Sequence, residues 1–406
     1  MVCRARGSGW GYLRRGARGS SSDLREGVGS PGLPSWEGRG LQGERRDEEA
    51  KANERQRAMK TIDRRTFIAG GAAVAAGIVR AQSRIVNQRK VNGDPDPAYD
   101  VEPVTDAEFD EAVKLLRGTT MFDDAKRAPA LAVVQRAIDR MVASRDFTAA
   151  MRDSTSKAKV EALLAKYPVM RWYDESFDRI LDEFEATTVT GDTPAIWYLY
   201  NMGIVVKTKT CAFGIDICHR KAARLANHLD FLLVTHNHGD HLNTRLINTM
   251  SGAGKPVISN FHLAWDWYCR DMEKTFKYKD ITIHTVAADH NKHLPWAVTT
   301  FEVKCGKGNG AYTIFHSGDC NRFDHLKPKG RPDVYFGHCA IGLDFMAAAK
   351  KTMPAKLFVP VHHQELGHIH SRWRCVAFED GPLPIVKSLC DAGYKAAMPV
   401  WGDRVV

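Results

Sequence analysis

Apolar positions change their spacing near residue 186, and this change divides the predicted secondary structure into two parts. Between residues 105 and 185, apolar side chains recur every three or four positions, which is typical of amphipathic helices. Thr105 followed by acidic residues is typical of a helix N-cap, and Pro129 suits a first helical position. The predicted helices begin near Thr105 and cover residues 129–144, 157–167 and 173–184.

From residue 186 onward the periodicity shortens to that of strands. Short apolar runs rich in β-branched and aromatic residues predict strands at 195–200, 203–206, 231–234, 281–283, 312–315, 334–336 and 357–359. Helical spacing returns between them and predicts helices at 243–250, 263–274, 343–352 and 384–392. Strands that alternate with helices favour a two-sheet sandwich flanked by helices.

The N-terminal part differs from both of these regions. Residues 1–58 are rich in Gly, Ser and Arg and lack periodic apolar content, so we interpret them as disordered or as an upstream extension that is not natively translated. Met59 is the predicted true start. Residues 59–81 combine Arg64-Arg65, a weakly apolar stretch and Ala81, and they resemble a twin-arginine export signal. An amphipathic surface helix with a chance arginine pair is the alternative.

The resemblance to an export signal predicts a periplasmic or otherwise exported protein. The apolar stretch within residues 59–81 is too short and too rich in Gly and Ala for a stable membrane span, which needs about 20 apolar residues. We expect residues 82–185 to form a helical N-terminal region. Residues 186–406 would then form the main domain.

The net charge of +10 comes from the N-terminal residues 1–90. Of the chain's 58 Lys and Arg and 48 Asp and Glu, residues 1–90 hold 19 and 9, so the remaining 39 and 39 balance. Nucleic-acid-binding proteins usually carry a concentrated positive face. A near-neutral mature domain therefore predicts no nucleic-acid partner and favours a small-molecule substrate, while the oligomeric state stays open.

All sixteen histidines lie between His219 and His370, and three of them cluster directly after the apolar run at 231–234. The sequence there reads Thr235-His236-Asn237-His238-Gly239-Asp240-His241. Alternation along an extended segment turns His236 and His238 to the same side, and Gly239 permits a tight turn that brings Asp240 and His241 to a neighbouring position. Imidazole nitrogen and carboxylate oxygen are ligands for ions such as Zn²⁺. The segment therefore predicts a metal site with two adjacent positions.

This segment resembles the H-x-H-x-D-H signature of the metallo-β-lactamase superfamily. The resemblance covers residues 186–406 and implies a four-layered αββα sandwich, here with an N-terminal helical extension. Later segments resemble the remaining ligand elements of the family in the same order. They are His290 after Val286-Ala287-Ala288-Asp289, Asp319 after Phe315-His316-Ser317-Gly318, and His362 or His363 after Val359-Pro360-Val361.

The resemblance also implies a role for each residue. His236, His238 and His290 would bind a first ion, Asp240, His241 and His362 a second, and Asp319 both. Asp240 and Asp319 are the predicted catalytic carboxylates. Asp216, at the end of Phe213-Gly214-Ile215, resembles an earlier strand-end aspartate of the family and would orient a ligand or its loop. Two divalent ions are implied, with Zn²⁺ as the default and Mn²⁺ or Fe²⁺ as alternatives.

Further histidines are candidates for contacts around the site. His293, His338 and His368 lie in segments expected near the metal-bearing edge, as does His370, and each could contact substrate or serve only in the structure. His284 and His316 are expected in the core or behind the ligands. Eight of nine cysteines follow residue 90 without a C-x-x-C pair, which disfavours a thiolate zinc site. Cys320, beside Asp319, is expected to be buried or close to the metals.

These features together predict a metal-dependent hydrolase that acts on a small-molecule lactone, ester, amide or phosphoester. The sequence looks closest to the branch that contains ascorbate-6-phosphate lactonase. One alternative is a mononuclear-iron enzyme similar to the persulfide dioxygenases of the same superfamily. The other is a metal-binding protein without catalytic activity.

Overall fold

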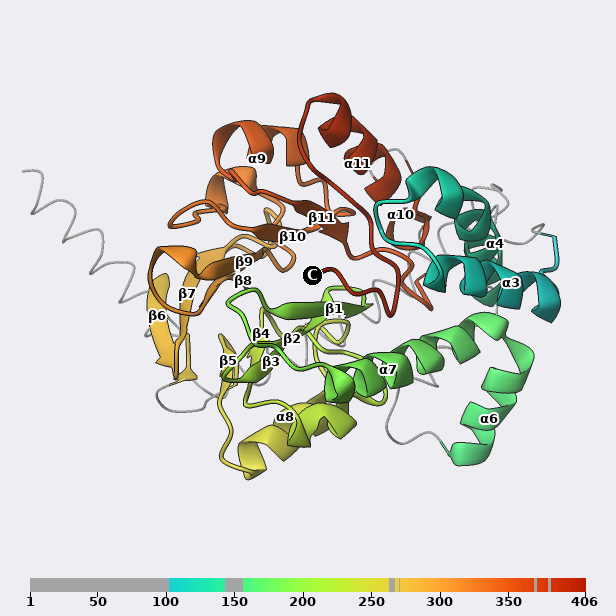
Figure 1. Cartoon of the computed structure of the whole chain (residues 1–406), viewed down its shortest axis with the longest axis horizontal. Coiled ribbons are helices and arrows are strands. Elements are labelled where there is room, and N and C mark those ends of the chain that lie inside the picture. The colour runs from blue at the N-terminus through green and yellow to red at the C-terminus, as the bar shows by residue number, and fades with distance from the viewer. Residues whose placement is uncertain (1–101, 143–155, 263–266, 270, 369–370, 379–380) are drawn as a thin grey trace, which may run out of the picture. The chain divides into compact units, whose positions relative to one another are not determined.

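The computed structural model describes residues 102–142, 156–262, 267–269, 271–368, 371–378 and 381–406, which belong to one compact unit, Pro95–Val406 (Figure 1). The predictions for residues 1–58 and for the export signal at 59–81 fall outside these residues and stay predictions. None of the helices within the described ranges combines the length and the apolar content that crossing a membrane takes.

The first described part is helical, as its spacing predicts. Its helices are α3 (Asp106–Arg117), α4 (Asp124–Val142), α6 (Lys157–Lys166) and α7 (Pro168–Ala186). The Thr105 hydroxyl accepts the Glu108 N–H at 3.2 Å, so Thr105 caps α3 as expected. The predicted start at Pro129 is wrong, because the Arg127 N–H already donates to the Asp123 carbonyl at 3.0 Å and Pro129 lies inside α4.

The second part contains a five-stranded sheet in the order β1-β2-β3-β4-β5. Strands β1 to β3 are antiparallel, and β3, β4 and β5 are parallel. The strands are β1 (Ala195–Tyr200), β2 (Gly203–Lys207), β3 (Ala212–Ile215), β4 (Phe231–Val234) and β5 (Val257–Ser259), with the short helix η2 (Ala222–Asn227) and α8 (Thr244–Gly252) between them. The side chains of β1, β3, β4 and β5 are buried throughout, as expected for strands covered on both faces.

A six-stranded sheet in the order β11-β10-β9-β8-β7-β6 faces the first one. Its strands are β6 (Glu273–Tyr278), β7 (Ile281–Ala288), β8 (Val298–Cys305), β9 (Tyr312–His316), β10 (Val334–His338) and β11 (Phe358–Val361). The later helices are η4 (Gly308–Gly310), η5 (Phe323–His325), α9 (Phe345–Lys351), α10 (Ser371–Arg374) and α11 (Pro382–Asp391). Strands β9, β10 and β11 are parallel, whereas β6 to β9 are antiparallel.

The sheets and helices form four layers. Helices α7 and α8 lie outside the first sheet, and α9 and α11 lie outside the second (Figure 1). Buried side chains of the N-terminal helices join the same apolar core, for example through Trp172 of α7, which stacks on Trp401 at 4.5 Å between ring centroids. The predicted αββα sandwich with a helical N-terminal extension is therefore confirmed.

One predicted helix and several boundaries are wrong. The helix predicted at 263–274 conflicts with β6, which begins at Glu273 and pairs with β7 from Glu273 to Tyr278. Its charged residues, Glu273, Lys274 and Lys277, suit an edge strand, where charged side chains discourage pairing with another chain. Strands β5 and β8 were not predicted, and β3 was implied only by the resemblance of Asp216 to a strand-end aspartate.

The C-terminal tail covers one edge of each sheet, at β1 and at β11. The Tyr198 N–H donates to the Asp403 carbonyl at 2.9 Å, and the Val405 N–H donates to the Ile196 carbonyl at 2.7 Å, so the tail runs along β1. On the other sheet, the Phe358 N–H donates to the Lys395 carbonyl at 2.9 Å. The tail thus satisfies backbone groups that an open sheet edge would expose.

Candidate metal centre

The candidate ligands follow the ends of strands from both sheets. Asp216 follows β3 and the segment 235–241 follows β4 in the first sheet. In the second sheet, the candidates that follow strands or end them are His290 after β7, Asp319 after β9, His338 at the end of β10 and His362 after β11. Segments far apart in the chain thereby reach one edge of the sandwich.

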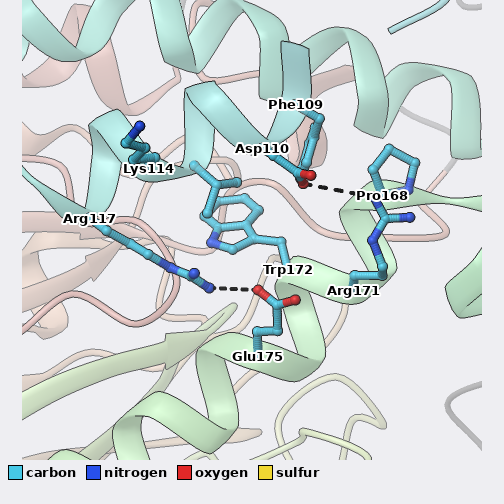
Figure 2. Close-up of a pocket in the computed structure, with 9 residues that line it drawn as sticks. Phe109, Asp110, Lys114, Arg117, Pro168, Arg171, Trp172 and Glu175 are labelled. Carbon is cyan, nitrogen blue, oxygen red and sulfur yellow. Dashed lines mark hydrogen bonds and ion pairs between the residues drawn. The ribbon is translucent and has the colours of Figure 1, made fainter. Parts of the chain in front are cut away.

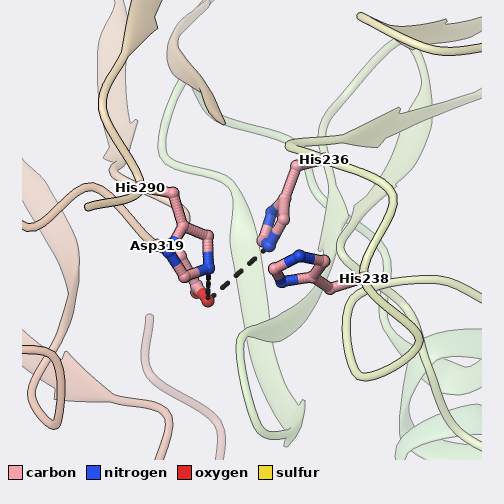
Figure 3. A group of neighbouring side chains, drawn as sticks. All are labelled: His236, His238, His290 and Asp319. Atoms are coloured by element: carbon pink, nitrogen blue, oxygen red, sulfur yellow. Dashed lines mark ion pairs between the residues drawn. The ribbon is translucent and has the colours of Figure 1, made fainter. Parts of the chain in front are cut away.

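The first group consists of His236, His238, His290 and Asp319, whose ligand atoms all lie within 4.8 Å of one another. Asp319 Oδ2 lies 3.2 Å from His290 Nε2 and 3.6 Å from His236 Nε2. Figure 3 shows the three rings and the carboxylate converging on one point. This is the set predicted for the first metal position together with the bridging aspartate.

The second group consists of Asp240, His241 and His362. His362 Nε2 lies 3.1 Å from Asp240 Oδ2, and His241 Nε2 lies 2.9 Å from Asp319 Oδ1. One oxygen of Asp319 therefore faces the first group and the other faces the second. The structure brings all seven predicted ligands together, with Asp319 between the two positions.

Asp216 holds the signature segment from behind. Its Oδ1 accepts the Thr235 N–H at 2.8 Å, its Oδ2 accepts the Thr235 hydroxyl at 2.7 Å, and Oδ2 lies 2.8 Å from His241 Nδ1. Thr235 Oγ1 in turn lies 3.0 Å from His236 Nδ1. Because the Thr235 proton points to Asp216, the hydroxyl accepts from His236. Both rings then carry a proton on Nδ1, which leaves Nε2 as the nitrogen that can bind a metal.

Several buried atoms of the cluster make no hydrogen bond of normal geometry within the described residues, although ion-pair distances join some of them. They include Nε2 of His236, His241 and His290 and Oδ1 of Asp319. Buried polar atoms are seldom left unpaired, and these four point into one centre of nitrogen and oxygen donors. The residues therefore fit divalent metal ions such as Zn²⁺, for which this donor set is suited.

His290 is held differently from the other candidate ligands. Its Nδ1 lies 3.0 Å from Asn291 Nδ2, while Asn291 Oδ1 accepts the N–H groups of His293 and Leu294 at 2.8 and 3.1 Å. The Asn291 amide thus donates to Nδ1, and this contact favours the proton on His290 Nε2. Metal binding by His290 Nε2 requires the Asn291 side chain to rotate away.

The charges around the centre call for a cation. Burial opposes a charge on the His241 ring, but three surrounding carboxylates outweigh it and raise the pKa of His241 well above its usual value. They belong to Asp319, Asp240 and Asp216. Burial alone would raise the pKa of Asp319, but the neighbouring imidazoles, His241 first, lower it well below its usual range. Asp319 is therefore an anion that a metal can bind.

Zinc binding should release a proton. His241 is protonated at neutral pH in the metal-free protein because its pKa is raised, and a metal needs its Nε2 lone pair, so each binding event should displace about one proton from this ring. The apparent zinc affinity should consequently fall as the pH is lowered. Zinc titrations by calorimetry in buffers with different heats of ionisation measure the protons released. Identical heats in all buffers would contradict the prediction.

The two ligand-bearing segments touch at Gly318, directly before Asp319. A Cβ on Gly318 would lie 2.7 Å from Thr235 Cβ, and Gly318 has a φ of +51°, in the left-handed region. Gly239 differs, because a Cβ there meets nothing within 4 Å and no left-handed φ is present. The turn at Gly239 therefore does not require a glycine. Gly318 does require one, because the backbone there lies too close to Thr235 for a side chain.

The variant Gly318→Ala should push Thr235 away from Asp216 and weaken the centre. We expect a loss of about 2 kcal/mol in the free energy of unfolding, from overpacking and the left-handed backbone, and weaker zinc binding. Denaturant titration and metal analysis measure both effects. The matched variant Gly239→Ala should leave stability and zinc content near wild type; equal losses in the two variants would argue against the role of Gly318.

Three predicted residues do not join the metal groups. His293 is exposed, and its N–H donates to Asn291. His363 is buried behind the centre, 5.6 Å from Tyr198 between ring centroids, and His362 takes the ligand position. His368 stacks on Trp373 at 4.6 Å. Among the described histidines predicted to contact substrate, only His338 lies against the candidate ligands, with Nε2 3.6 Å from Asp319 Oδ1. His370 lies outside the described residues, and its role stays a prediction.

The remaining predicted neighbours are structural. His316 Nε2 lies 2.9 Å from the Met202 carbonyl, and His284 pairs with Thr275 across the sheet, with 3.2 Å between Thr275 Oγ1 and His284 Nδ1. Cys320 is buried, and its thiol donates to the Arg322 carbonyl at 3.2 Å. The eight cysteines within the described ranges are all free thiols.

Two residues of the site have no signal in the sequence analysis. Asn201, in the turn between β1 and β2, points its Nδ2 at the Asp240 carbonyl and at His362 Nε2, both at 3.1 Å. Glu365 places Oε2 3.9 Å from His362 Nδ1, and burial, with Asp240 next, raises the pKa of Glu365 well above its usual value. The left-handed φ of Asn201, +58°, suits a turn, but a turn residue alone does not point to chemistry.

A separate hollow of about 350 Å³ lies between α3 and α7 (Figure 2). Phe109, Val113 and Trp172 supply its apolar lining. Arg117 pairs with Glu175 across it, with 2.8 Å between Nη2 and Oε2. None of its lining residues belongs to the metal groups, so the hollow is distinct from the candidate centre.

No family model matches the sequence, and no curated protein matches it. Several solved structures are similar to the structure of this chain. Igni18, a metallo hydrolase from the archaeon Ignicoccus hospitalis, is similar with a TM-score of 0.41 and 17% identity over 52% of this chain and 97% of that chain. CmlA, a diiron β-hydroxylase from Streptomyces venezuelae, gives 0.37 and 12% over 52% and 53%.

A protein of the metallo-β-lactamase superfamily from Thermotoga maritima is also similar, with a TM-score of 0.28 and 14% identity over 44% of this chain and 80% of that chain. None of these similarities is close in sequence, and they include both hydrolytic and oxidative proteins. A neighbour's activity therefore does not carry over to this chain. What the chain does has to be inferred from its own site.

Proposed function

We propose that this protein is a metal-dependent hydrolase of a small-molecule lactone, ester, amide or phosphoester. The observation that carries the proposal is the position of Asp319, with one carboxylate oxygen toward His236 and His290 and the other toward His241. A shared carboxylate between two sets of nitrogen and oxygen donors suits two adjacent divalent ions. Zn²⁺ is the default, with Mn²⁺ or Fe²⁺ as alternatives.

Two bound ions would supply a Lewis acid and would lower the pKa of a bound water toward neutrality. The chain's own residues would hold these ions and orient the ligand side chains. Asp216 fixes His241 through Nδ1, and Thr235 fixes His236. Asp240, whose pKa His241 and His362 lower against the effect of burial, stays ionised, so it can bind a metal ion and accept a hydrogen bond from a water at the centre.

A mononuclear-iron dioxygenase is the second candidate from the sequence. The complete second group, Asp240, His241 and His362, argues against it, because a single ion would leave these three donors without a role. The bonds from Asp216 to His241 and Thr235 would serve metal binding with or without activity, so turnover is what separates a hydrolase from a metal-binding protein without activity. Of the two catalytic alternatives, hydrolysis is the better supported chemistry.

The finer assignments are proposals as well. The likeness of the sequence to the ascorbate-6-phosphate lactonase branch points to a small substrate, and the balanced charge of residues 91–406 gives no attraction for nucleic acid. Export through a twin-arginine route would carry the protein folded and already metal-loaded. Fractionation of cells that express the full chain, with Arg64 and Arg65 changed to lysine in a second strain, tests export directly.

Metal analysis combined with a substrate panel tests the proposal. The purified full chain is loaded with Zn²⁺, Mn²⁺ or Fe²⁺ and assayed with chromogenic lactone, phosphodiester and β-lactam substrates. We expect two equivalents of metal and turnover of at least one class, both lost in His236→Ala. His228, which pairs with Glu185 on the surface, provides the matched control His228→Ala. A protein that takes up no metal, or full turnover by His236→Ala, would refute the assignment.

A further inference from the structure

Three buried histidines share one unusual hydrogen bond. In each, the ring Nδ1 accepts the backbone N–H of the residue two positions later. The donor–acceptor distances are 3.0 Å for His219, 3.2 Å for His316 and 2.9 Å for His338. A backbone N–H can only donate, so Nδ1 carries no proton. In the neutral ring the proton must then sit on Nε2, which becomes a hydrogen-bond donor.

His338 differs from the other two histidines in what its Nε2–H contacts. His219 donates to the Tyr173 carbonyl at 3.1 Å, and His316 donates to the Met202 carbonyl at 2.9 Å. The Nε2 of His338 is buried and has no hydrogen-bond partner among the described residues. It lies 3.6 Å from Asp319 Oδ1, and its ring stacks on His362 at 3.8 Å between centroids. An unused donor is therefore aimed into the candidate centre.

By distance alone His338 could be a metal ligand, since its nitrogen forms a close group with atoms of Asp319 and His362. A metal, however, needs the lone pair on Nε2, and the bond from Ala340 N–H leaves a proton there. Unlike the Asn291 side chain beside His290, a backbone amide at a strand end cannot rotate away. His338 is thus built to donate a hydrogen bond.

We propose that His338 is a catalytic hydrogen-bond donor, whose Nε2–H binds an oxygen of the substrate above the Asp319 carboxylate. The inference rests on the proposed function and adds a substrate contact to it. An acyl or phosphoryl oxygen gains negative charge as hydrolysis proceeds, and a fixed N–H stabilises that charge without reorganising. His338 is rigidly placed, because it ends β10 between β9 and β11. The substrate class is accordingly one with an oxyanion-forming carbonyl or phosphoryl group.

Inorganic phosphate serves as the oxyanion probe. Zinc content is measured by mass spectrometry and phosphate binding by calorimetry on the zinc-loaded full chain, for wild type, His338→Ala, His338→Gln and His362→Ala. His338→Ala should keep the zinc content of wild type and bind phosphate about 10-fold more weakly, as expected for a lost hydrogen bond to an anion. His338→Gln should recover part of the affinity through its amide N–H, and His362→Ala should lose zinc.

Zinc loss in His338→Ala comparable with His362→Ala would make His338 a ligand and overturn the proposal. Equal phosphate affinity in wild type and His338→Ala, or no phosphate binding by zinc-loaded wild type, would overturn it too. A wild-type protein that binds no zinc would instead refute the hydrolase assignment on which it rests. Should the alanine variant misfold, nitrogen-15 spectra of the wild-type ring decide, because the Nε2–H tautomer of His338 must persist after zinc loading.

Discussion

The variant Asp319→Ala is expected to lose both metal ions and to reduce any hydrolytic turnover by about three orders of magnitude or more, since the Lewis acid supplies several kcal/mol of transition-state stabilisation. Asp319 Oδ2 lies near His290 and His236, and Oδ1 lies 2.9 Å from His241 Nε2. Removing one carboxylate therefore takes a ligand from both positions at once. No other described carboxylate reaches both groups.

The measurement is zinc content by mass spectrometry together with turnover of whichever substrate of the panel wild type hydrolyses. Asp319→Asn keeps the shape but not the charge, so it should retain at most one ion. Asp324 provides a matched aspartate on the surface, where it pairs with Arg322, and Asp324→Ala should behave like wild type. Two equivalents of zinc, or unreduced turnover, in Asp319→Ala would exclude the bridging role.

The second large effect is expected from Asp216→Ala. Asp216 is not a candidate ligand, yet its replacement should lower both the free energy of unfolding and the metal affinity. The carboxylate accepts two hydrogen bonds from Thr235 and faces His241 Nδ1 at 2.8 Å. Three buried donors lose their partner, and each such loss costs about 1 to 3 kcal/mol, so a decrease of about 3 kcal/mol or more in the free energy of unfolding is expected. Zinc affinity should fall about 10- to 100-fold, as for other groups that orient a ligand.

The backbone at this position calls for a specific control. Asp216 has a φ of +50°, which disfavours alanine by about 1 to 2 kcal/mol in addition to the lost hydrogen bonds. The variant Asp216→Gly removes the carboxylate without the cost of an alanine in this conformation, so its difference from Asp216→Ala measures the backbone contribution. Denaturant titration and zinc calorimetry compare the two. If Asp216→Gly matched wild type in both, the carboxylate would not be what holds His241 and Thr235.

Much of the secondary structure can be read from local patterns. The strands at 195–200, 231–234 and 312–315 lie where their apolar runs predict them, because a short buried strand needs little beyond a run of apolar residues. Strands β3, β5 and β8 differ, because the runs of apolar residues do not predict them. Strand β3 contains Gly214, where a Cβ would come within 2.8 Å of Ile217, and glycine lowers the strand signal.

Other misses have the same kind of cause. Strand β5, Val257–Ser259, is only three residues long, and β8 places Glu302 and Lys304 among its apolar residues. Glu302 is tolerated because its Oε2 accepts the Lys329 N–H at 2.6 Å. Such a partner, from a loop on the same sheet, cannot be deduced from alternation along one strand.

The sequence by itself determined the types and the order of the candidate ligands, because the signature from His236 to His241 is local and its later partners follow strand ends. Only the tertiary structure decided which oxygen of Asp319 faces which histidines, and on which nitrogen His338 carries its proton. Asn201 and His362, in contact at 3.1 Å, stand 161 residues apart. Contacts of this range depend on how the two sheets pack, and local spacing along the chain does not encode them.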